Sequence, residues 1–218
     1  MKKGLTELVF VLDRSGSMSG LESDTIGGFN AMLEKQKALK GDCVVTSVLF
    51  DDRYELLHDR IRLAGVMPLT NETYYVRGNT ALLDAIGRTI DKIGGVQQHT
   101  APDEQAEKVL FVIITDGMEN SSREYRYERV REMIERQKER YGWEFLFLGA
   151  NIDAISVASR FGIAPDRAVT YCPDGEGTRL NYEAVCCAAE CVREGRPVAK
   201  DWKKSIEEDH KKRGSTRR

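Results

Sequence analysis

The chain has 218 residues, of which 41% are hydrophobic and 31% are charged, and the charges nearly cancel to a formal net charge of -2. This length and apolar content are sufficient for one large domain with a buried core, which argues against a disordered chain. The charge balance favours neither nucleic acid nor an anionic membrane as a partner.

The first part of the chain predicts three strands. Residues 8–12 form an unbroken apolar run, which is typical of a strand covered on both faces of a parallel sheet. Residues 44–50 predict a second strand, and after two aspartates residues 54–58 predict a third that pairs with it as a hairpin. This hairpin would add one antiparallel edge strand. Residues 62–79 then form a long connection, and connections of that length in compact domains are often functional.

The middle of the chain predicts a central strand between two helices. A helix follows the long connection, and the polar residues 94–107 after it, rich in helix breakers, predict a mobile loop. Residues 109–114 are again wholly apolar and predict the central strand. In residues 127–141 apolar side chains recur at helical spacing, which predicts an amphipathic covering helix. On its charged side, Glu132 and Arg136 are spaced for an ion pair.

The last third predicts two more strands, at residues 145–148 and 168–171. Between them, Asp153 can cap a helix that ends at Gly162. A further helix is predicted from about Leu180 to Arg193. Its shared apolar face is expected to consist of Leu180, Ala184, Cys187, Ala188 and Cys191.

The alternation of strands and helices, with one hairpin, predicts an α/β fold. We expect a doubly wound, mostly parallel sheet with one antiparallel edge strand and helices on both faces. This domain would occupy residues 1–195. Residues 197–218 carry eight Lys or Arg against four acidic residues. We expect residues 196–218 to form a basic, flexible C-terminal tail.

The cysteines and the apolar runs predict the compartment. Five cysteines are an odd number, and Cys186, Cys187 and Cys191 fall in one predicted helix. Such a set suits a reducing compartment better than a disulfide framework. No stretch approaches the ~18 apolar residues of a spanning helix, and the first residues lack the pattern of a signal peptide. We therefore expect a cytoplasmic protein that does not bind a membrane.

Unusual polar residues follow two of the predicted strands. The first strand stops at Asp13-Arg14-Ser15-Gly16-Ser17, and the central strand stops at Thr115-Asp116-Gly117. Between them, Gly78-Asn79-Thr80-Ala81-Leu82 opens a helix. Ligands of doubly wound sheets gather at the carboxyl ends of the strands, where the strand order reverses. Each segment alone is also typical of a turn or a helix cap, but three such segments at these positions favour a binding site.

The side chains of these segments indicate a hard metal ion. Hydroxyl and carboxylate oxygens without His or Cys select Mg²⁺, Mn²⁺ or Ca²⁺ over zinc or copper. Ser15 and Ser17 converge on one ion only if the backbone turns sharply, which Gly16 permits. Only two carboxylates lie nearby, so the ion remains electron-poor. An acidic side chain of a partner can then complete its coordination.

Together the three segments resemble the metal-ion-dependent adhesion site (MIDAS) of von Willebrand factor A (VWA) domains. The resemblance covers roughly residues 5–195 and extends to small stand-alone bacterial VWA proteins. It implies a Rossmann-like fold and a complete metal site, in which the hydroxyls contact the metal directly and the aspartates often act through water. The implied metal ligands are Asp13, Ser15, Ser17, Thr80 and Asp116.

We therefore expect an intracellular protein-interaction module, and not an enzyme, whose Mg²⁺ (or Mn²⁺ or Ca²⁺) coordinates an exposed Asp or Glu of a protein partner. Movement of the loop around Thr80 is expected to alter the affinity. Two alternatives stay open. A metal-dependent hydrolase would activate water with the same ion. No residue of the motif segments is placed as an evident general base for it, although Glu119 and Asp84 lie close in sequence. An RNA-associated scaffold would use the basic tail, although nucleic acid is otherwise not expected.

Overall fold

The computed structural model describes residues 1–216, with side chains described through Arg213. Its six strands form one sheet in the order β3-β2-β1-β4-β5-β6. The β2–β3 pair is antiparallel and every other pair is parallel. The strands are β1 (Lys2–Asp13), β2 (Cys43–Phe50), β3 (Tyr54–Arg62), β4 (Ala106–Thr115), β5 (Glu144–Ala150) and β6 (Ala168–Tyr171). The predicted doubly wound sheet with one antiparallel edge strand is therefore confirmed.

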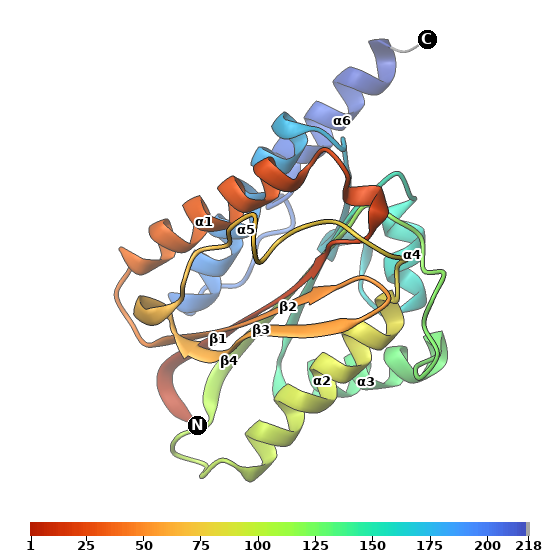
Figure 1. Cartoon of the computed structure of the whole chain (residues 1–218). Helices are drawn as coiled ribbons and strands as arrows, with labels where there is room; N and C mark the ends of the chain where they lie inside the picture. The colour runs from red at the N-terminus through yellow and green to blue at the C-terminus, as the bar shows by residue number, and fades with distance from the viewer. Residues whose placement is uncertain (217–218) are drawn as a thin grey trace.

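Helices cover both faces of this sheet (Figure 1). The helices are α1 (Glu22–Lys37), α2 (Leu82–His99), α3 (Tyr127–Tyr141), α4 (Ala154–Arg160), α5 (Gly175–Arg193) and α6 (Lys204–Thr216). Three single turns of 3-10 helix add to them, at Gly16–Met18, Leu63–Gly65 and Pro165–Arg167. Within residues 1–216, none of these helices has the length and apolar character needed to cross a bilayer.

Alternate residues of the central strands enter two separate cores. In β1, Leu8, Phe10 and Leu12 belong to the core under α1 and α5, whereas Val9 and Val11 belong to the core under α2, α3 and α4. All five side chains are at most 1% exposed. An unbroken apolar run is what a strand with both faces covered requires, because successive side chains point to opposite faces.

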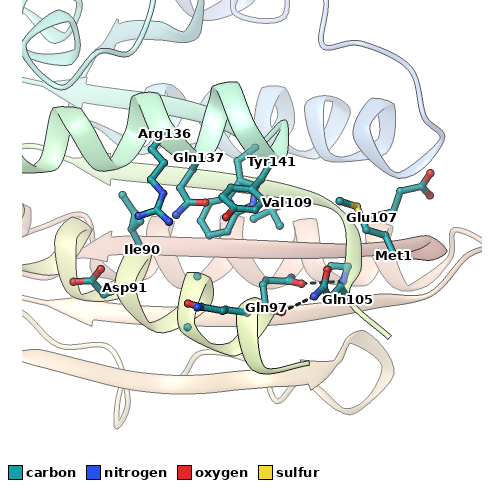
Figure 2. Close-up of a pocket in the computed structure, with 15 residues that line it drawn as sticks. Met1, Ile90, Asp91, Gln97, Gln105, Glu107, Val109, Arg136, Gln137 and Tyr141 are labelled. Atoms are coloured by element: carbon teal, nitrogen blue, oxygen red, sulfur yellow. Dashed lines mark hydrogen bonds between the residues drawn. The ribbon is translucent and has the colours of Figure 1, made fainter. Parts of the chain in front are cut away.

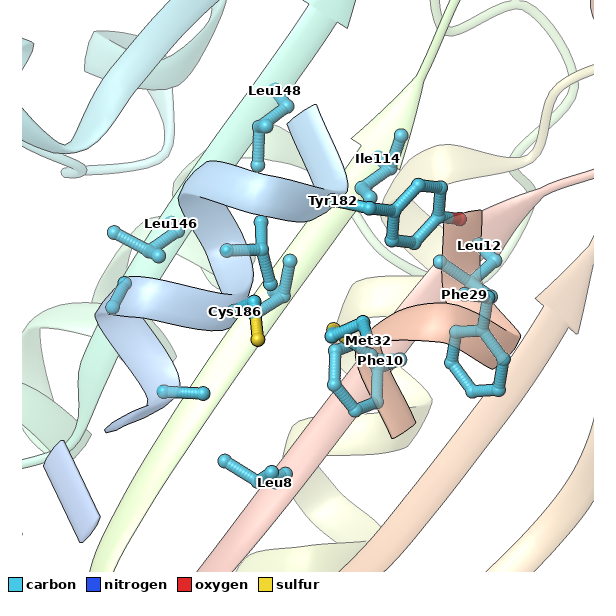
Figure 3. Close-up of a cluster of buried hydrophobic side chains, with 14 of the residues drawn as sticks. Leu8, Phe10, Leu12, Phe29, Met32, Ile114, Leu146, Leu148, Tyr182 and Cys186 are labelled. Atoms are coloured by element: carbon cyan, nitrogen blue, oxygen red, sulfur yellow. The ribbon is translucent and has the colours of Figure 1, made fainter. Parts of the chain in front are cut away.

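Aromatic packing joins α1 to α5 above the first core. The Phe29 ring meets Phe10 edge to face at 5.3 Å between centroids, and Tyr182 at 6.3 Å. Figure 3 shows Cys186 on the same side of α5, turned toward the sheet. The expected placement of Cys187 was wrong: its side chain is exposed, and the neighbouring Cys186 of α5 is buried instead. The packed face of α5 includes Ala184 and Ala188, as expected, and it extends through Tyr182, Val185 and Cys186.

Two local expectations differ from the structure. The expected mobile loop at residues 94–107 is mostly regular, because α2 continues to His99 and β4 already begins at Ala106. The glycines in α2 are tolerated because Ile93 and its apolar neighbours are buried against the sheet. Glu132 pairs with Arg129 at 3.4 Å and not with Arg136, which has no ion pair among the described residues.

The C-terminal segment was expected to be a flexible tail, but its described part packs on the domain. Val198 and Ile206 are buried, and the Trp202 indole donates a hydrogen bond to the Asp166 carbonyl at 2.8 Å. The Lys203 ammonium donates to two backbone carbonyls, of Pro165 and Ala168. These apolar residues among the charges are the physical reason for the packing. Arg217 and Arg218 of the expected tail lie outside the described residues.

Candidate metal centre

The predicted site residues meet where the strand order reverses. β1 pairs with β2 on one side and with β4 on the other, and its carboxyl end at Asp13 lies beside that of β4. The Ser15 hydroxyl contacts the other two: it lies 2.9 Å from the Ser17 oxygen and 3.0 Å from that of Thr80. The structure therefore brings together hydroxyls that are up to 65 positions apart in sequence.

Asp13 is oriented by its neighbours. One carboxylate oxygen accepts the backbone N–H of Ser15 at 2.7 Å, and the other accepts the Thr115 hydroxyl at 2.5 Å. The Tyr74 hydroxyl donates to the Asp13 backbone carbonyl at 2.6 Å. Burial raises the pKa of Asp13 to about 6, and the nearby Asp116 carboxylate also raises it, against the hydrogen bonds from Thr115 and Ser15. The site thus holds this carboxyl where negative charge is costly unless a cation is near.

Asp116 provides the clearest unsatisfied group of the cluster. It is 3% exposed, and its Oδ1 has no hydrogen-bond partner. Burial raises its pKa, although a hydrogen bond with Ser17 opposes the shift. A buried carboxylate oxygen without a partner carries a large desolvation penalty, which a coordinated cation would remove. The residues therefore fit a divalent ion with a preference for oxygen ligands.

Gly117 makes the close approach of the loops possible. A Cβ atom at this position would lie 2.9 Å from the Ser17 hydroxyl oxygen and 3.1 Å from that of Thr80. Any larger side chain would push into the hydroxyl cluster. Within residues 1–216, no group of three or more His, Cys, Asp or Glu side chains is arranged to hold a metal. The candidate site thus depends on hydroxyls as much as on carboxylates.

The loop that carries Thr80 is tied to the domain from both sides. The Gly16 N–H donates to the Gly78 carbonyl at 3.1 Å, and the Ala81 N–H donates to the Asp51 carbonyl at 2.8 Å. Asn120 bonds the backbone of Thr80 through both its side chain and its own N–H. Thr80 is therefore held in place by backbone contacts to three different segments.

A buried charge network braces the same loop. Arg14 is fully buried, and its guanidinium lies 3.2 Å from the Asp51 carboxylate and 2.6 Å from that of Glu55. Arg77 reaches the same Asp51 oxygen at 2.5 Å. The Tyr75 ring lies against both guanidiniums, 5.4 Å from that of Arg14 and 5.3 Å from that of Arg77. These contacts fasten the segment before Thr80 to the β2–β3 hairpin.

Glu119 and Asp84 both bind the backbone. Glu119 accepts the N–H groups of Leu83, Ser121 and Ser122 and the Ser122 hydroxyl. Asp84 accepts three consecutive N–H groups, from Arg123 to Tyr125. Both carboxylates thus shape the loop between Asp116 and α3 and fix it to the start of α2.

The predicted ligands Asp13, Ser15, Ser17, Thr80 and Asp116 all lie in this one cluster. Sequence reasoning missed the residues that support it. Asp51 directly follows β2 at the same carboxyl end of the strands, and that position was a signal that could have found it. Tyr74 and Asn120 carry no such signal, because their roles depend on contacts across 61 and 40 positions of the chain.

Comparison with known proteins shows the fold. No protein-family model matches the sequence, and no curated protein matches it. Among solved structures, proximal thread matrix protein 1 from the mussel byssus, with a zinc-occupied MIDAS motif, is similar with a TM-score of 0.58 and 17% identity. This likeness covers 85% of this chain and 46% of that chain.

Two microbial structures are similar to the same extent. A D319A mutant of the PilB minor pilin from Streptococcus sanguinis matches with a TM-score of 0.60 and 12% identity, over 90% of this chain and 62% of that chain. The ArnB paralog VWA2 from Sulfolobus acidocaldarius matches with a TM-score of 0.52 and 16% identity, over 85% and 45%. The chain thus spans roughly half the length of these proteins. At such identities the likeness establishes a VWA-like fold and nothing finer.

Proposed function

We propose that this chain is a metal-dependent protein-interaction module. Its five clustered oxygen side chains would hold a divalent cation, Mg²⁺ in the first place, and an Asp or Glu of a protein partner would complete the coordination. The observation that carries this proposal is the buried, unpartnered Oδ1 of Asp116 beside three clustered hydroxyls. One solved structure with the same fold has a zinc-occupied MIDAS motif, which supports a divalent ion at the corresponding place.

The charges of the clustered residues suit this function. Ser15, Ser17 and Thr80 are neutral, so a cation bound among them keeps a strong attraction for an anionic partner group. Asp13 supplies negative charge to the site, and its carboxylate is held by hydrogen bonds from the Thr115 hydroxyl and the Ser15 N–H. A bound cation would act as a Lewis acid that accepts a carboxylate oxygen of the partner.

The contacts of Glu119 and Asp84 support a binding role over hydrolysis. Each carboxylate already accepts three or more hydrogen bonds from the protein, so neither is free to take a proton from a water at the site. The packing of Trp202 and Ile206 likewise supports a structural role for the basic segment over RNA binding. A cytoplasmic location stays a prediction.

The test is partner capture by the immobilised full chain in Mg²⁺, with elution by EDTA. We expect a captured protein to be released by EDTA, to be absent from Asp13→Ala and Thr80→Ala columns, and to lose binding when one exposed Asp or Glu of that protein is changed to Asn or Gln. Ser121→Ala is the matched control. Ser121 lies in the loop between Asp116 and α3, and it contacts Glu119 through its backbone N–H, which the substitution keeps. Turnover of phosphoesters or peptides that requires Asp13 would overturn the proposal in favour of a hydrolase.

A further inference from the structure

A second candidate site lies at the other end of the strands, away from the candidate metal site. A cavity of about 420 Å³ opens between α2 and α3, beside the start of β4 (Figure 2). Because β4 begins there and ends at the metal centre, the two sites occupy opposite ends of the parallel strands. The volume falls within the range of small-molecule sites, about 300 to 1,000 Å³.

One wall of this cavity is rigidly held. The Gln97 amide donates to the buried carboxylate of Glu7 at 2.9 Å and accepts the Ala106 N–H at 3.2 Å. The Gln105 amide donates to the carbonyls of Gln97 and Thr100 at 2.9 and 3.0 Å. The dashed lines in Figure 2 mark contacts of this wall. These amides have their partners within the protein and leave the shape of the cavity preorganised.

Gln137 on the facing helix is different. It is 9% exposed, yet neither atom of its side-chain amide hydrogen-bonds another described residue. Figure 2 shows its side chain pointing from α3 toward α2, into the cavity. Neither amide atom is among the buried polar atoms that lack a partner, so the amide faces the accessible space of the cavity. The free amide therefore offers a coplanar donor and acceptor to a ligand.

Glycines keep the space in front of this amide open. A Cβ atom at Gly94 would lie 3.3 Å from the Gln137 amide nitrogen, and a Cβ atom at Gly95 would meet nothing within 4 Å. Both glycines line the cavity from α2. Any larger residue at Gly95 would project into empty space, so the cavity depends on the absence of side chains there.

Tyr141 and Arg136 complete the surroundings of the amide. Tyr141 is one helical turn after Gln137 and is 46% exposed, so its ring offers a face for stacking. Arg136 also lines the cavity and has no ion pair among the described residues. Asp91 lies across the cavity on α2, where the Tyr125 hydroxyl donates to one of its oxygens.

We propose that this cavity binds an adenine nucleoside. The Gln137 amide presents the donor and acceptor pair that matches the N6 and N7 edge of adenine. Tyr141 would stack on the base, as aromatic residues do in single-strand recognition, and the free Asp91 oxygen would accept a ribose hydroxyl. A 5′-phosphate, where present, would face Arg136. Guanine presents two acceptors at the same edge and cannot satisfy the amide in the same way.

The test is isothermal titration of the full chain with adenosine, AMP and guanosine in EDTA, which keeps the result independent of the proposed metal function. We expect adenosine to bind at millimolar or lower concentration and guanosine to bind about tenfold more weakly. Gln137→Leu should weaken adenosine about tenfold, and Gly95→Leu should abolish binding by filling the cavity. Gly27→Leu is the matched control, because Gly27 is also a helical glycine with nothing within 4 Å of its Cβ position.

Arg136→Gln separates the two forms of the ligand: it should weaken AMP and leave adenosine unchanged. Absence of adenosine binding to the wild-type chain would overturn the proposal. So would adenosine binding that Gln137→Leu and Gly95→Leu leave unchanged while both variants keep the circular dichroism of the wild type, because the ligand would then lie elsewhere. Equal affinity for guanosine and adenosine would overturn the assignment of the amide to the adenine edge.

Discussion

Thr80 and Asn120 hold each other through two hydrogen bonds. The Thr80 N–H donates to the Asn120 side-chain oxygen at 2.9 Å, and the Asn120 N–H donates to the Thr80 carbonyl at 3.1 Å. Thr80 lies at the end of the long connection after β3, and Asn120 lies in the loop after β4. Thr80 is therefore positioned by the loop that also carries Asp116.

Replacing Asn120 with Ala should weaken metal binding more than it weakens the fold. The change removes one hydrogen bond, worth about 1 kcal/mol, and frees the Thr80 backbone. We expect Mg²⁺ affinity to fall about tenfold or more by isothermal titration. Asn30→Ala is the matched control, because Asn30 also binds a loop backbone, that of Leu69, through two hydrogen bonds but does not contact Thr80. If both variants lose Mg²⁺ affinity equally, the positioning role of Asn120 is refuted.

Mg²⁺ should raise the melting temperature of the wild-type chain. A cation that binds the native cluster and not the unfolded chain stabilises the fold by about 1.4 kcal/mol at roughly ten times its dissociation constant. For a domain of this size the midpoint should shift by roughly 3 to 6 °C. A thermal scan in EDTA and then in excess Mg²⁺ measures it, and Asp13→Ala should abolish the shift. No shift with Mg²⁺, Mn²⁺ or Ca²⁺ would count against the site.

Acidification should destabilise the fold through His58. Burial lowers the pKa of this histidine, although a hydrogen bond with the Met67 backbone opposes the shift. A lowered folded-state pKa means that the unfolded chain binds the proton more tightly. The contribution of His58 to the free energy of unfolding is therefore complete above the ordinary histidine pKa near 6.5. It is lost as the pH falls below that value, by at most about 1.4 kcal/mol per pH unit.

Urea unfolding in EDTA between neutral and mildly acidic pH checks the His58 prediction. His58→Gln should flatten the dependence of the unfolding free energy on pH. His99→Gln is the control, because the His99 side chain is exposed. An unchanged slope in His58→Gln would show that other groups govern the acid sensitivity.

The cysteines should differ in their rates of alkylation. Cys187 is exposed, whereas Cys43 and Cys186 are buried. Burial also raises the pKa of the Cys43 thiol to about 11, which lowers its thiolate fraction further. Iodoacetamide labelling of the native chain, followed by peptide mass spectrometry, should modify Cys187 well before the other two. Denaturation should remove the difference, and fast native labelling of Cys186 would contradict the packing of α5.

The C-terminal segment should stabilise the domain. Ile206 is 1% exposed in the first core, so Ile206→Ala should lower the unfolding free energy by about 2 to 4 kcal/mol. Ile155→Ala is the control, because Ile155 is 40% exposed and its loss should cost within about 0.5 kcal/mol. Equal effects in urea unfolding would mean that residues after 195 contribute little to the fold, as a flexible tail would.

The sequence by itself determined the strands, the class of fold and the residues of the candidate metal site. Unbroken apolar runs such as residues 8–12 can be buried only between two layers of helices, and the polar residues after them must then lie at the carboxyl edge of the sheet. Local patterns carry this information because side-chain periodicity and strand ends are properties of short segments. The five clustered side chains that we propose as metal ligands were therefore named from the sequence alone.

Tertiary structure decided what surrounds and supports that cluster. The Arg14–Asp51–Arg77 network, the Asn120 contacts of Thr80 and the unpartnered amide of Gln137 depend on segments that are distant in sequence. So does the choice of Cys186 over Cys187 as the buried thiol, because a helix made of small residues has no strong apolar stripe and the partner surface selects its packed face. The same holds for the C-terminal segment, whose few apolar residues are buried only because β6 and α5 offer them a surface.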